Sequence, residues 1–207
     1  MIILNKPIIL LGGGGHASVL IEILILTNST ILGIVDPQLQ KGISINGIPV
    51  LGNDDIVLDY SKEKVRLVNG VGPKVKNSSR EQLSNKFINL GYKFSTLIHP
   101  NASVSKSSTI EEGSQIMAGA IIQTKALIGK LSVINSGAII EHDCIIGEHN
   151  HIAPGAVLCG GVCTESGVFI GSGAVVLENL RIKSHSIIAA GSTLRKNITN
   201  KEIFYGH

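Results

Sequence analysis

The sequence predicts two domains of different class, an α/β domain of half-Rossmann type in residues 1–98 and a parallel β-helix in residues 99–207. Strand-like and helical segments alternate in the first part, around a glycine-rich turn. In the second part, from Val104 to Leu194, every sixth residue is aliphatic, with one exception. Neither a helix nor a flat strand has a period of six, whereas a coil of three short strands does.

The first predicted element is an apolar strand at residues 8–11, followed by the turn Gly-Gly-Gly-Gly-His-Ala at residues 12–17. A helical pattern covers residues 18–26, and a second strand at residues 30–35 ends at Asp36. The turn fits the dinucleotide-binding pattern G-x-G-x-x-A, and Asp36 lies about twenty residues on, where an acid usually binds a ribose hydroxyl. The alternative is a tight strand-to-helix turn without a ligand.

The α/β alternation continues with a strand at residues 65–68, a helix at residues 78–90 and a strand at residues 94–98. We place the domain boundary at the His99-Pro100 step that follows. About a hundred residues contain too few strands for a full dinucleotide fold, so a mononucleotide or a nucleotide-linked sugar fits better. Backbone N–H groups at residues 14–16, where the first helix is expected to start, would bind its phosphate.

The repeat of the second domain has rules at several positions. Three residues after the aliphatic, the chain usually has Gly, Asn, Asp or His, which best tolerate positive φ, so this turn slot is expected to be left-handed. The next residue is usually small, which suits the inside of a corner. At eighteen residues per coil, the repeat predicts about five coils. The aliphatic series, broken only at Thr164, is Val104, Ile110, Ile116, Ile122, Ile128, Ile134, Ile140, Ile146, Ile152, Leu158, Ile170, Val176, Ile182, Ile188 and Leu194.

Composition and charge exclude several classes of function. The 207 residues are 43% hydrophobic and 16% charged, which is typical of a folded protein. A net charge of +3, without a basic run between aromatics, does not indicate a nucleic-acid surface. No apolar stretch is long enough to span a membrane, and three cysteines without zinc-site spacing fit a reducing compartment. We therefore expect a cytoplasmic protein that binds neither nucleic acid, membrane nor metal.

The slot before each aliphatic points outward, and in the central coils it is largely apolar. Because apolar side chains on several coils are not left to water, we expect packing against copies of the same chain, and a closed trimer suits a three-sided coil. His151 is the one histidine in this stripe, either as a packing residue or as a ligand contact near a subunit cleft. The apolar members are Ile121, Leu127, Val133, Ile139, Ile145, Val157, Cys163, Phe169 and Val175.

His142 occupies a slot that is mostly polar in the other coils, two residues after its aliphatic. It is either an ordinary surface histidine or a general base. Asp143 follows and could orient the imidazole if the geometry of the corner brings the two side chains together. Gly160 lies eighteen residues on, one coil along, and would leave open space and an N–H group beside the ring, where a reacting carbonyl could lie.

The glycine turn, the hexapeptide repeats and the block Ile-Asn-Ser-Gly-Ala-Ile-Ile-Glu-His-Asp at residues 134–143 resemble the NeuD/PglD-type family of bacterial sugar acetyltransferases. So does the block Ile-Gly-Glu-His-Asn-His at residues 146–151, and the resemblance covers nearly the whole chain. It implies a left-handed coil and a cytoplasmic homotrimer, with active sites between subunits. It also implies transfer of acetyl from acetyl-CoA to a nucleotide-linked 4-amino-6-deoxy sugar, for surface glycan synthesis.

The resemblance implies roles for particular residues. His142 would be the general base, with Asp143 raising its basicity and Asn135 helping to hold the site. His151 would bind the thioester end of acetyl-CoA, and the Gly160 N–H would stabilise the oxyanion. The cofactor groove would be lined by Gly171, Ser172 and Ala190. The nucleotide-sugar would be held by Gly14, Gly15, His16, Asp36 and Gly72.

The sequence departs from the family pattern at three places. Many relatives have Glu where this chain has Asp143, and some have a second Asp where it has Pro37. Relatives also usually continue with Pro-Ala-Lys beyond the point where this chain reads Gly206-His207, so part of a cofactor-binding tail is expected to be missing.

Three other functions remain open. The nearest is O-acetylation of sialic acid or a related sugar, which would use the same base and cofactor but needs no nucleotide pocket. A β-helical carbonic anhydrase would need three histidines on zinc, and the histidines here lack its His-x4-His spacing. A non-catalytic binding trimer would keep the aliphatic repeat, but would leave the coincidence of Gly160 with His142 unexplained.

Overall fold

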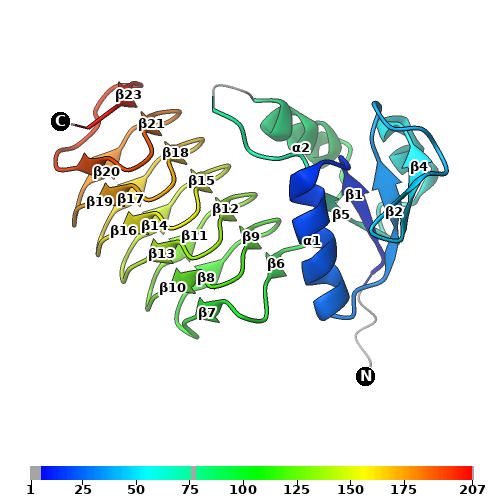
Figure 1. Ribbon diagram of the computed structural model, residues 1–207, viewed down its shortest axis with the longest axis horizontal. Coiled ribbons are helices and arrows are strands. Elements are labelled where there is room, and N and C mark those ends of the chain that lie inside the picture. The colour runs from blue at the N-terminus through cyan, green and yellow to red at the C-terminus, as the bar shows by residue number, and fades with distance from the viewer. Residues whose placement is uncertain (1–5, 76–77, 207) are drawn as a thin grey trace. The chain divides into compact units, whose positions relative to one another are not determined.

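The computed structural model describes residues 6–75 and 78–206. The chain forms two compact units, Met1–Leu97 and Ile98–His207. The first unit contains the α/β elements and the second the parallel β-helix, so the predicted fold class is confirmed (Figure 1).

The first unit is built on a five-stranded sheet with the order β3-β4-β2-β1-β5. Its strands are parallel except for β3, which forms an antiparallel hairpin with β4. The central strand β1 is fully buried, as its four consecutive aliphatic residues predict. The strands are β1 (Ile8–Leu11), β2 (Ile31–Val35), β3 (Ser44–Ile45), β4 (Ile48–Gly52) and β5 (Arg66–Asn69).

The order in which strands are added to the sheet changes side at β1, because β2 and β4 lie on one side of β1 and β5 lies on the other. In open parallel sheets, ligands bind outside the carboxyl ends of the strands at such a switch point. The loops that leave β1 and β5 therefore mark the place for a ligand in this unit. Helix α1 (Gly15–Leu26) follows β1, the short 3₁₀ helix η1 (Asp54–Asp59) follows β4, and α2 (Ser79–Asn89) follows β5.

The second unit is a coil of two-residue parallel strands stacked in three sheets (Figure 1). The first sheet contains β6 (Leu97–Ile98), β9 (Gln115–Ile116), β12 (Val133–Ile134), β15 (His151–Ile152), β18 (Phe169–Ile170), β21 (Ile187–Ile188) and β23 (Ile203–Phe204). The second contains β7 (Ser103–Val104), β10 (Ile121–Ile122), β13 (Ile139–Ile140), β16 (Val157–Leu158), β19 (Val175–Val176) and β22 (Thr193–Leu194). The third contains β8 (Thr109–Ile110), β11 (Leu127–Ile128), β14 (Ile145–Ile146), β17 (Cys163–Thr164) and β20 (Arg181–Ile182).

From β7 to β22 each strand pairs with the strand eighteen residues away, whereas β21 and β23 pair at a spacing of sixteen residues. The five-stranded sheet defines five complete coils. The second residue of the strands points into the coil, where the aliphatic repeat forms one continuous core. The predicted left-handed turn slot is also confirmed, since Asp143, His149, Asn179 and His185 have φ between 56° and 59°. Lys125 and Leu131 adopt the same conformation, although their residue types gave no sign of it.

The structure differs from the sequence prediction between β2 and β5. The β3–β4 hairpin and η1 were not predicted, because strands of two residues and a single 3₁₀ turn leave little periodicity in a sequence.

Two other elements differ in their bounds from the prediction. The strand expected at residues 94–98 is reduced to β6 and an isolated bridge between Phe94 and Leu67. Helix α1 begins at Gly15, three residues earlier than its apolar pattern.

Candidate active site

His142 and Asp143 form a hydrogen-bonded pair at the corner of the β-helix between β13 and β14. The His142 Nδ1 and the Asp143 Oδ2 are 2.8 Å apart. Adjacent residues of a strand would point apart, but the φ of +59° at Asp143 turns its carboxylate toward the ring. Both side chains are more than half exposed, at 59% and 54%. With the Nδ1 proton donated to the carboxylate, Nε2 carries the lone pair and can accept a proton from a bound molecule.

Gly160 occupies the same position one coil further along. A Cβ atom at this residue would lie 2.6 Å from both Cε1 and Nε2 of His142, so any side chain here would collide with the imidazole. The sequence suggested that the missing side chain at Gly160 leaves open space beside His142. In the structure the His142 ring itself fills that space. Within the described part of the chain, the Gly160 N–H donates no backbone or side-chain hydrogen bond, which leaves it available to a ligand.

A shallow depression of about 320 Å³ contains this pair and the same corner of the next two coils. Glu178 and Asn179 complete it from the coil beyond Gly160, and the sequence prediction missed both. Their signal is the coil spacing, because residue 178 is thirty-six residues, or two coils, after His142. The lining residues are His142, Asp143, Gly160, Gly161, Glu178 and Asn179.

The nearby cysteines are poorly suited to act as nucleophiles. Burial raises the pKa of the Cys144 thiol to about 11. Burial also raises the pKa of Cys159, and the charges of Glu178 and Glu141 raise it further. Because the thiolate is the reactive form of cysteine, these shifts make both thiols weak nucleophiles.

Of the predicted site residues, Gly160 lies beside His142, but Asn135 and the other residues expected to bind the cofactor lie elsewhere on the β-helix. Asn135, Gly171, Ser172 and Ala190 belong to the corner between the first and second sheets, whereas His142 belongs to the corner between the second and third. The Asn135 Oδ1 accepts a 2.8 Å hydrogen bond from the Ser136 N–H. Gly171 is required by packing, since a Cβ there would meet the backbone of Ala189 and Ala190.

His151 lies on a face of the coil and not at a corner, as the first residue of β15. Its side chain is buried and packs on Phe169 of the next coil, with 4.7 Å between ring centroids and 41° between ring planes. Within one chain, the predicted site residues of the β-helix therefore occupy two corners and one face. They do not converge on a single pocket.

In the first unit, the predicted nucleotide-binding residues surround the turn between β1 and α1. Gly14 is the N-cap residue of α1 and has no side chain to cap the helix. Cβ atoms at Gly14 and Gly15 would meet nothing within 4 Å, so the turn is open. The Asp36 carboxylate accepts 2.8 Å hydrogen bonds from the Gly13 and Gln38 N–H groups, so it orders the turn directly.

The loop after β5 faces the same turn, and a buried network holds it. A Cβ at Gly72 would lie 3.5 Å from the His16 Cβ. Arg80 of α2 donates from Nη1 to the carbonyls of Asn69, at 2.8 Å, and of Val71, at 2.6 Å. The Asn69 Oδ1 in turn accepts the Val71 N–H at 3.0 Å. Burial lowers the pKa of Arg80 to about 9, and sequence periodicity gave no sign of this network.

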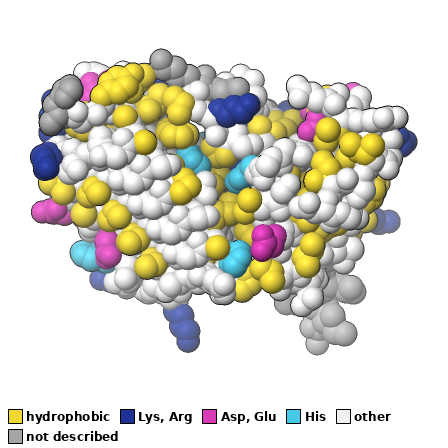
Figure 2. Space-filling view, viewed as in Figure 1, with side chains coloured by type: hydrophobic (Ala, Val, Ile, Leu, Met, Phe, Trp, Pro, Cys, Tyr) yellow, Lys and Arg dark blue, Asp and Glu magenta, His cyan; other side chains and the backbone are white. Residues whose placement is uncertain are grey.

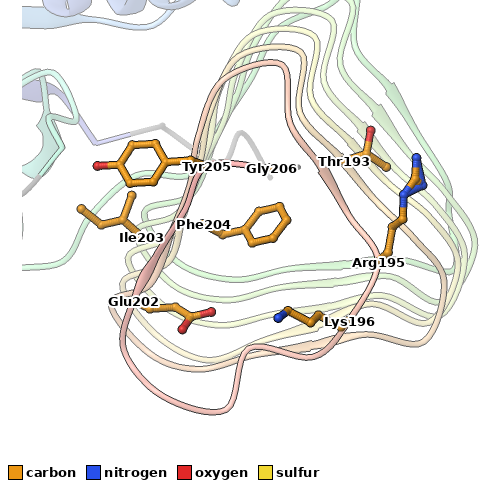
Figure 3. Close-up of a pocket in the computed structure, with 8 residues that line it drawn as sticks. All are labelled: Thr193, Arg195, Lys196, Glu202, Ile203, Phe204, Tyr205 and Gly206. Atoms are coloured by element: carbon orange, nitrogen blue, oxygen red, sulfur yellow. The ribbon is translucent and has the colours of Figure 1, made fainter.

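A second depression of about 540 Å³ lies at the C-terminal end of the β-helix. Figure 3 shows the ring of Phe204 inside the triangular outline of the coil, and the side chain of Tyr205 outside it. Phe204 packs on the interior core and so covers its end. Lys196 follows Glu178 by one further coil, and together with Arg195 it adds positive charge to this end.

The described residues contain no group of three or more His, Cys, Asp or Glu side chains arranged to hold a metal ion. None of the helices resolved in residues 6–75 and 78–206 is long and apolar enough to cross a membrane.

Comparison with known proteins gives the class. The PglD N-terminal domain model matches residues 7–87, and the bacterial transferase hexapeptide model (six repeats) matches residues 125–160. A comparison with curated proteins found no significant match. Both family models and the likeness to solved structures show that the chain belongs to the NeuD/PglD-type bacterial sugar acetyltransferases.

Particular solved structures resemble the whole chain. PerB from Caulobacter crescentus, in complex with CoA and GDP-perosamine, is 34% identical with a TM-score of 0.83, covering 93% of this chain and 90% of that one. The acetyltransferase domain of PglB from Neisseria gonorrhoeae FA1090, in complex with acetyl coenzyme A, is 30% identical with a TM-score of 0.85, covering 94% and 93%. WeeI from Acinetobacter baumannii AYE, at 24% identity, a TM-score of 0.82 and 92% coverage of each chain, supports the fold alone.

Proposed function

We propose that this chain transfers the acetyl group of acetyl-CoA to the amine of a nucleotide-linked 4-amino-6-deoxy sugar, with His142 as general base. The observation that carries the proposal is the 2.8 Å pair of His142 and Asp143, with the imidazole fitted against Gly160. This arrangement fixes the ring, leaves Nε2 for an acceptor and puts a backbone N–H donor on the next coil.

The chemistry follows from the groups in the corner. The sugar amine attacks the thioester carbonyl, and Nε2 of His142 takes the proton that the nitrogen loses. The negative charge on the carbonyl oxygen is stabilised by the Gly160 N–H. Collapse of the tetrahedral intermediate breaks the carbon–sulfur bond, and the CoA thiolate leaves with a proton from the imidazolium. Acetyl-CoA is already activated, so no enzyme nucleophile is needed.

The first unit supplies the place for the nucleotide. The open turn at Gly14 and Gly15 lies at the switch point of the sheet, at the uncapped N-terminus of α1. Backbone N–H groups there suit a diphosphate, and the helix dipole adds to the attraction. His16 and Gly72 flank this turn, and Asp36 orders it and has further lone pairs for a ribose hydroxyl. The complex of PerB with GDP-perosamine supports this substrate class.

We further propose a homotrimer with active sites between subunits. His142 and the residues expected to bind acetyl-CoA lie on different corners of one chain, so a second copy is needed to bring them together. Figure 2 shows hydrophobic side chains spread over the visible face of the β-helix. Ile145, on the third sheet, is 51% exposed, and packing against another copy would bury it.

The cosubstrate would run along the coil, with its acetyl group at His142. Gly171, Ser172, Ala190 and His151 of a neighbouring copy would line the groove, as the family resemblance implies. The free cysteines Cys144, Cys159 and Cys163 fit the reducing cytoplasm, where the product would enter surface glycan synthesis.

The experiment is a release assay for the CoA thiol, with UDP-, dTDP- and GDP-linked 4-amino-6-deoxy sugars as acceptors. Free and CMP-linked sialic acid are run beside them. We expect turnover on one amino sugar and none on sialic acid. Turnover on sialic acid alone would overturn the proposed acceptor and show an O-acetyltransferase. Absence of turnover on every acceptor, by a trimer that also fails to bind CoA, would favour a non-catalytic binding protein.

A further inference from the structure

Two buried residues break the rules of the repeat, and they are hydrogen-bonded to each other. Thr164 takes an interior position that is aliphatic in every other coil, and Asn150 takes a corner slot that is usually small. Both are buried, with 5% and 1% of their surface exposed. The Asn150 Nδ2 donates to the Thr164 Oγ1. One exception to the repeat therefore accounts for the other, because each satisfies a polar group that would otherwise be buried alone.

The pair belongs to a network that joins three coils. The Asn150 Oδ1 accepts a 2.6 Å hydrogen bond from the Val168 N–H, one coil further on. The Asn150 N–H donates to the Ser132 Oγ at 3.0 Å, one coil before. Thr164 Oγ1 also accepts a 3.2 Å hydrogen bond from the N–H of Gly147, the residue that follows β14 one coil before. The side chain of Asn150 thus uses both its donor and its acceptor inside the protein.

His151 follows Asn150 directly, and it is held by the same neighbour. The His151 N–H donates to the Val168 carbonyl at 2.9 Å, while the Val168 N–H donates to the Asn150 side chain. The His151 ring packs on Phe169, the residue after Val168. Two hydrogen bonds and one ring contact therefore fix the residue pair 150–151 against the pair 168–169.

We propose that Asn150 and Thr164 are positioning residues that fix the place of the His151 imidazole for its contact with acetyl-CoA. The inference rests on the proposed function for the identity of the ligand, but the fixing of His151 can be measured without it. A buried amide and hydroxyl are costly to desolvate, whereas Ala and Val would satisfy the repeat at these two positions. Their presence beside His151 is explained if they hold a functional side chain.

The variants are Thr164→Val, which is isosteric and removes only the hydroxyl, and Asn150→Ala, which places a common residue in its slot. Both residue types occur at equivalent positions, for example at Val176 and Ala156, so both variants are compatible with the coil. Ser114→Ala is the matched control, because Ser114 also donates from a buried corner, to the Gly129 carbonyl at 2.9 Å, two coils before Asn150. Thr164→Ser restores the hydroxyl.

Each trimer is measured for its Kd for CoA by calorimetry and for its His151 Cε1–H signal by NMR. We expect Thr164→Val and Asn150→Ala to weaken CoA binding roughly tenfold and to shift the His151 signal, with Ser114→Ala and Thr164→Ser close to wild type. If Thr164→Val lowers stability as Ser114→Ala does but leaves both readouts unchanged, the pair is only structural and the inference is wrong. If wild type fails to bind CoA, the proposed function fails, and the NMR shift alone decides the positioning role.

Discussion

The imidazole of His142 and the missing side chain at Gly160 depend on each other. The spacing of eighteen residues predicted their proximity, because every residue of a regular coil lies over the one eighteen positions earlier. The sequence did not reveal that the ring fills the space above Gly160. The turn slot predicted the positive φ of Asp143, but the sequence did not establish that this φ brings the carboxylate into contact with the ring.

Gly160→Ala should displace the His142 ring without unfolding the chain. The added methyl would lie 2.6 Å from Cε1 and Nε2, and the exposed ring can move away. We expect kcat/KM to fall by roughly ten- to a hundredfold, while the free energy of unfolding changes by less than about 1 kcal/mol.

Ser166→Ala is the control, because it also leaves an alanine in the same slot of the next corner along the chain, away from the His142 ring. Steady-state kinetics and thermal unfolding of both variants check the result. Equal activity of Gly160→Ala and wild type would show that the fit of the ring against residue 160 has no role in the reaction.

At the scale of the element, periodic segments were predicted well and irregular ones were not. A run of four aliphatic residues predicts the strand at residues 8–11, and an aliphatic residue at every sixth position predicts the interior of the β-helix. The β3–β4 hairpin and the network of Arg80 with Asn69 depend on tertiary contacts between residues that share no pattern. For the same reason, the role of Asp36 in ordering the Gly13 turn emerged only from the structure.

Arg80→Met should loosen the loop after β5. The substitution keeps a long apolar side chain but removes the donor to the carbonyls of Asn69 and Val71. We expect faster hydrogen exchange at the Val71 amide, a loss of about 1–3 kcal/mol of stability and a raised KM for the nucleotide-sugar.

Lys86→Met on the same helix removes an exposed cation, whose partner is Asp55 at 3.5 Å. It controls for the loss of charge on α2. Hydrogen exchange followed by mass spectrometry measures both variants. Identical protection of Val71 in the two would contradict the role given to Arg80.

At the scale of the whole molecule, one chain does not bring all the predicted site residues together. The repeat predicted outward apolar side chains, and Ile145 is 51% exposed, but Val133 of the same predicted stripe is buried. The corner on which each candidate residue lies became clear only from the three stacked sheets. The proposed base, His142, lies at one corner beside Gly160, and the other residues expected to bind acetyl-CoA lie at another corner and a face. Assembly and catalysis are therefore coupled in our account.

Ile145→Asp tests this coupling. The side chain is 51% exposed on the third sheet, and a charge there would be desolvated in a contact between copies. We expect the trimer to dissociate and acetyl transfer to be lost, while circular dichroism stays unchanged. Ile43→Asp, at a 41% exposed position of the first unit, is the control. Light scattering after gel filtration gives the masses, and a monomeric wild type would contradict the assembly.

The most direct test of the central claim is the kcat/KM of acetyl transfer by wild type and by His142→Ala, measured with the best nucleotide-linked amino sugar. A general base at His142 predicts a loss of roughly two to four orders of magnitude, with the fold and the binding of CoA unchanged. An alanine variant that retains activity within about threefold of wild type would show that the acceptor loses its proton to another group, and the assignment of the base would be wrong.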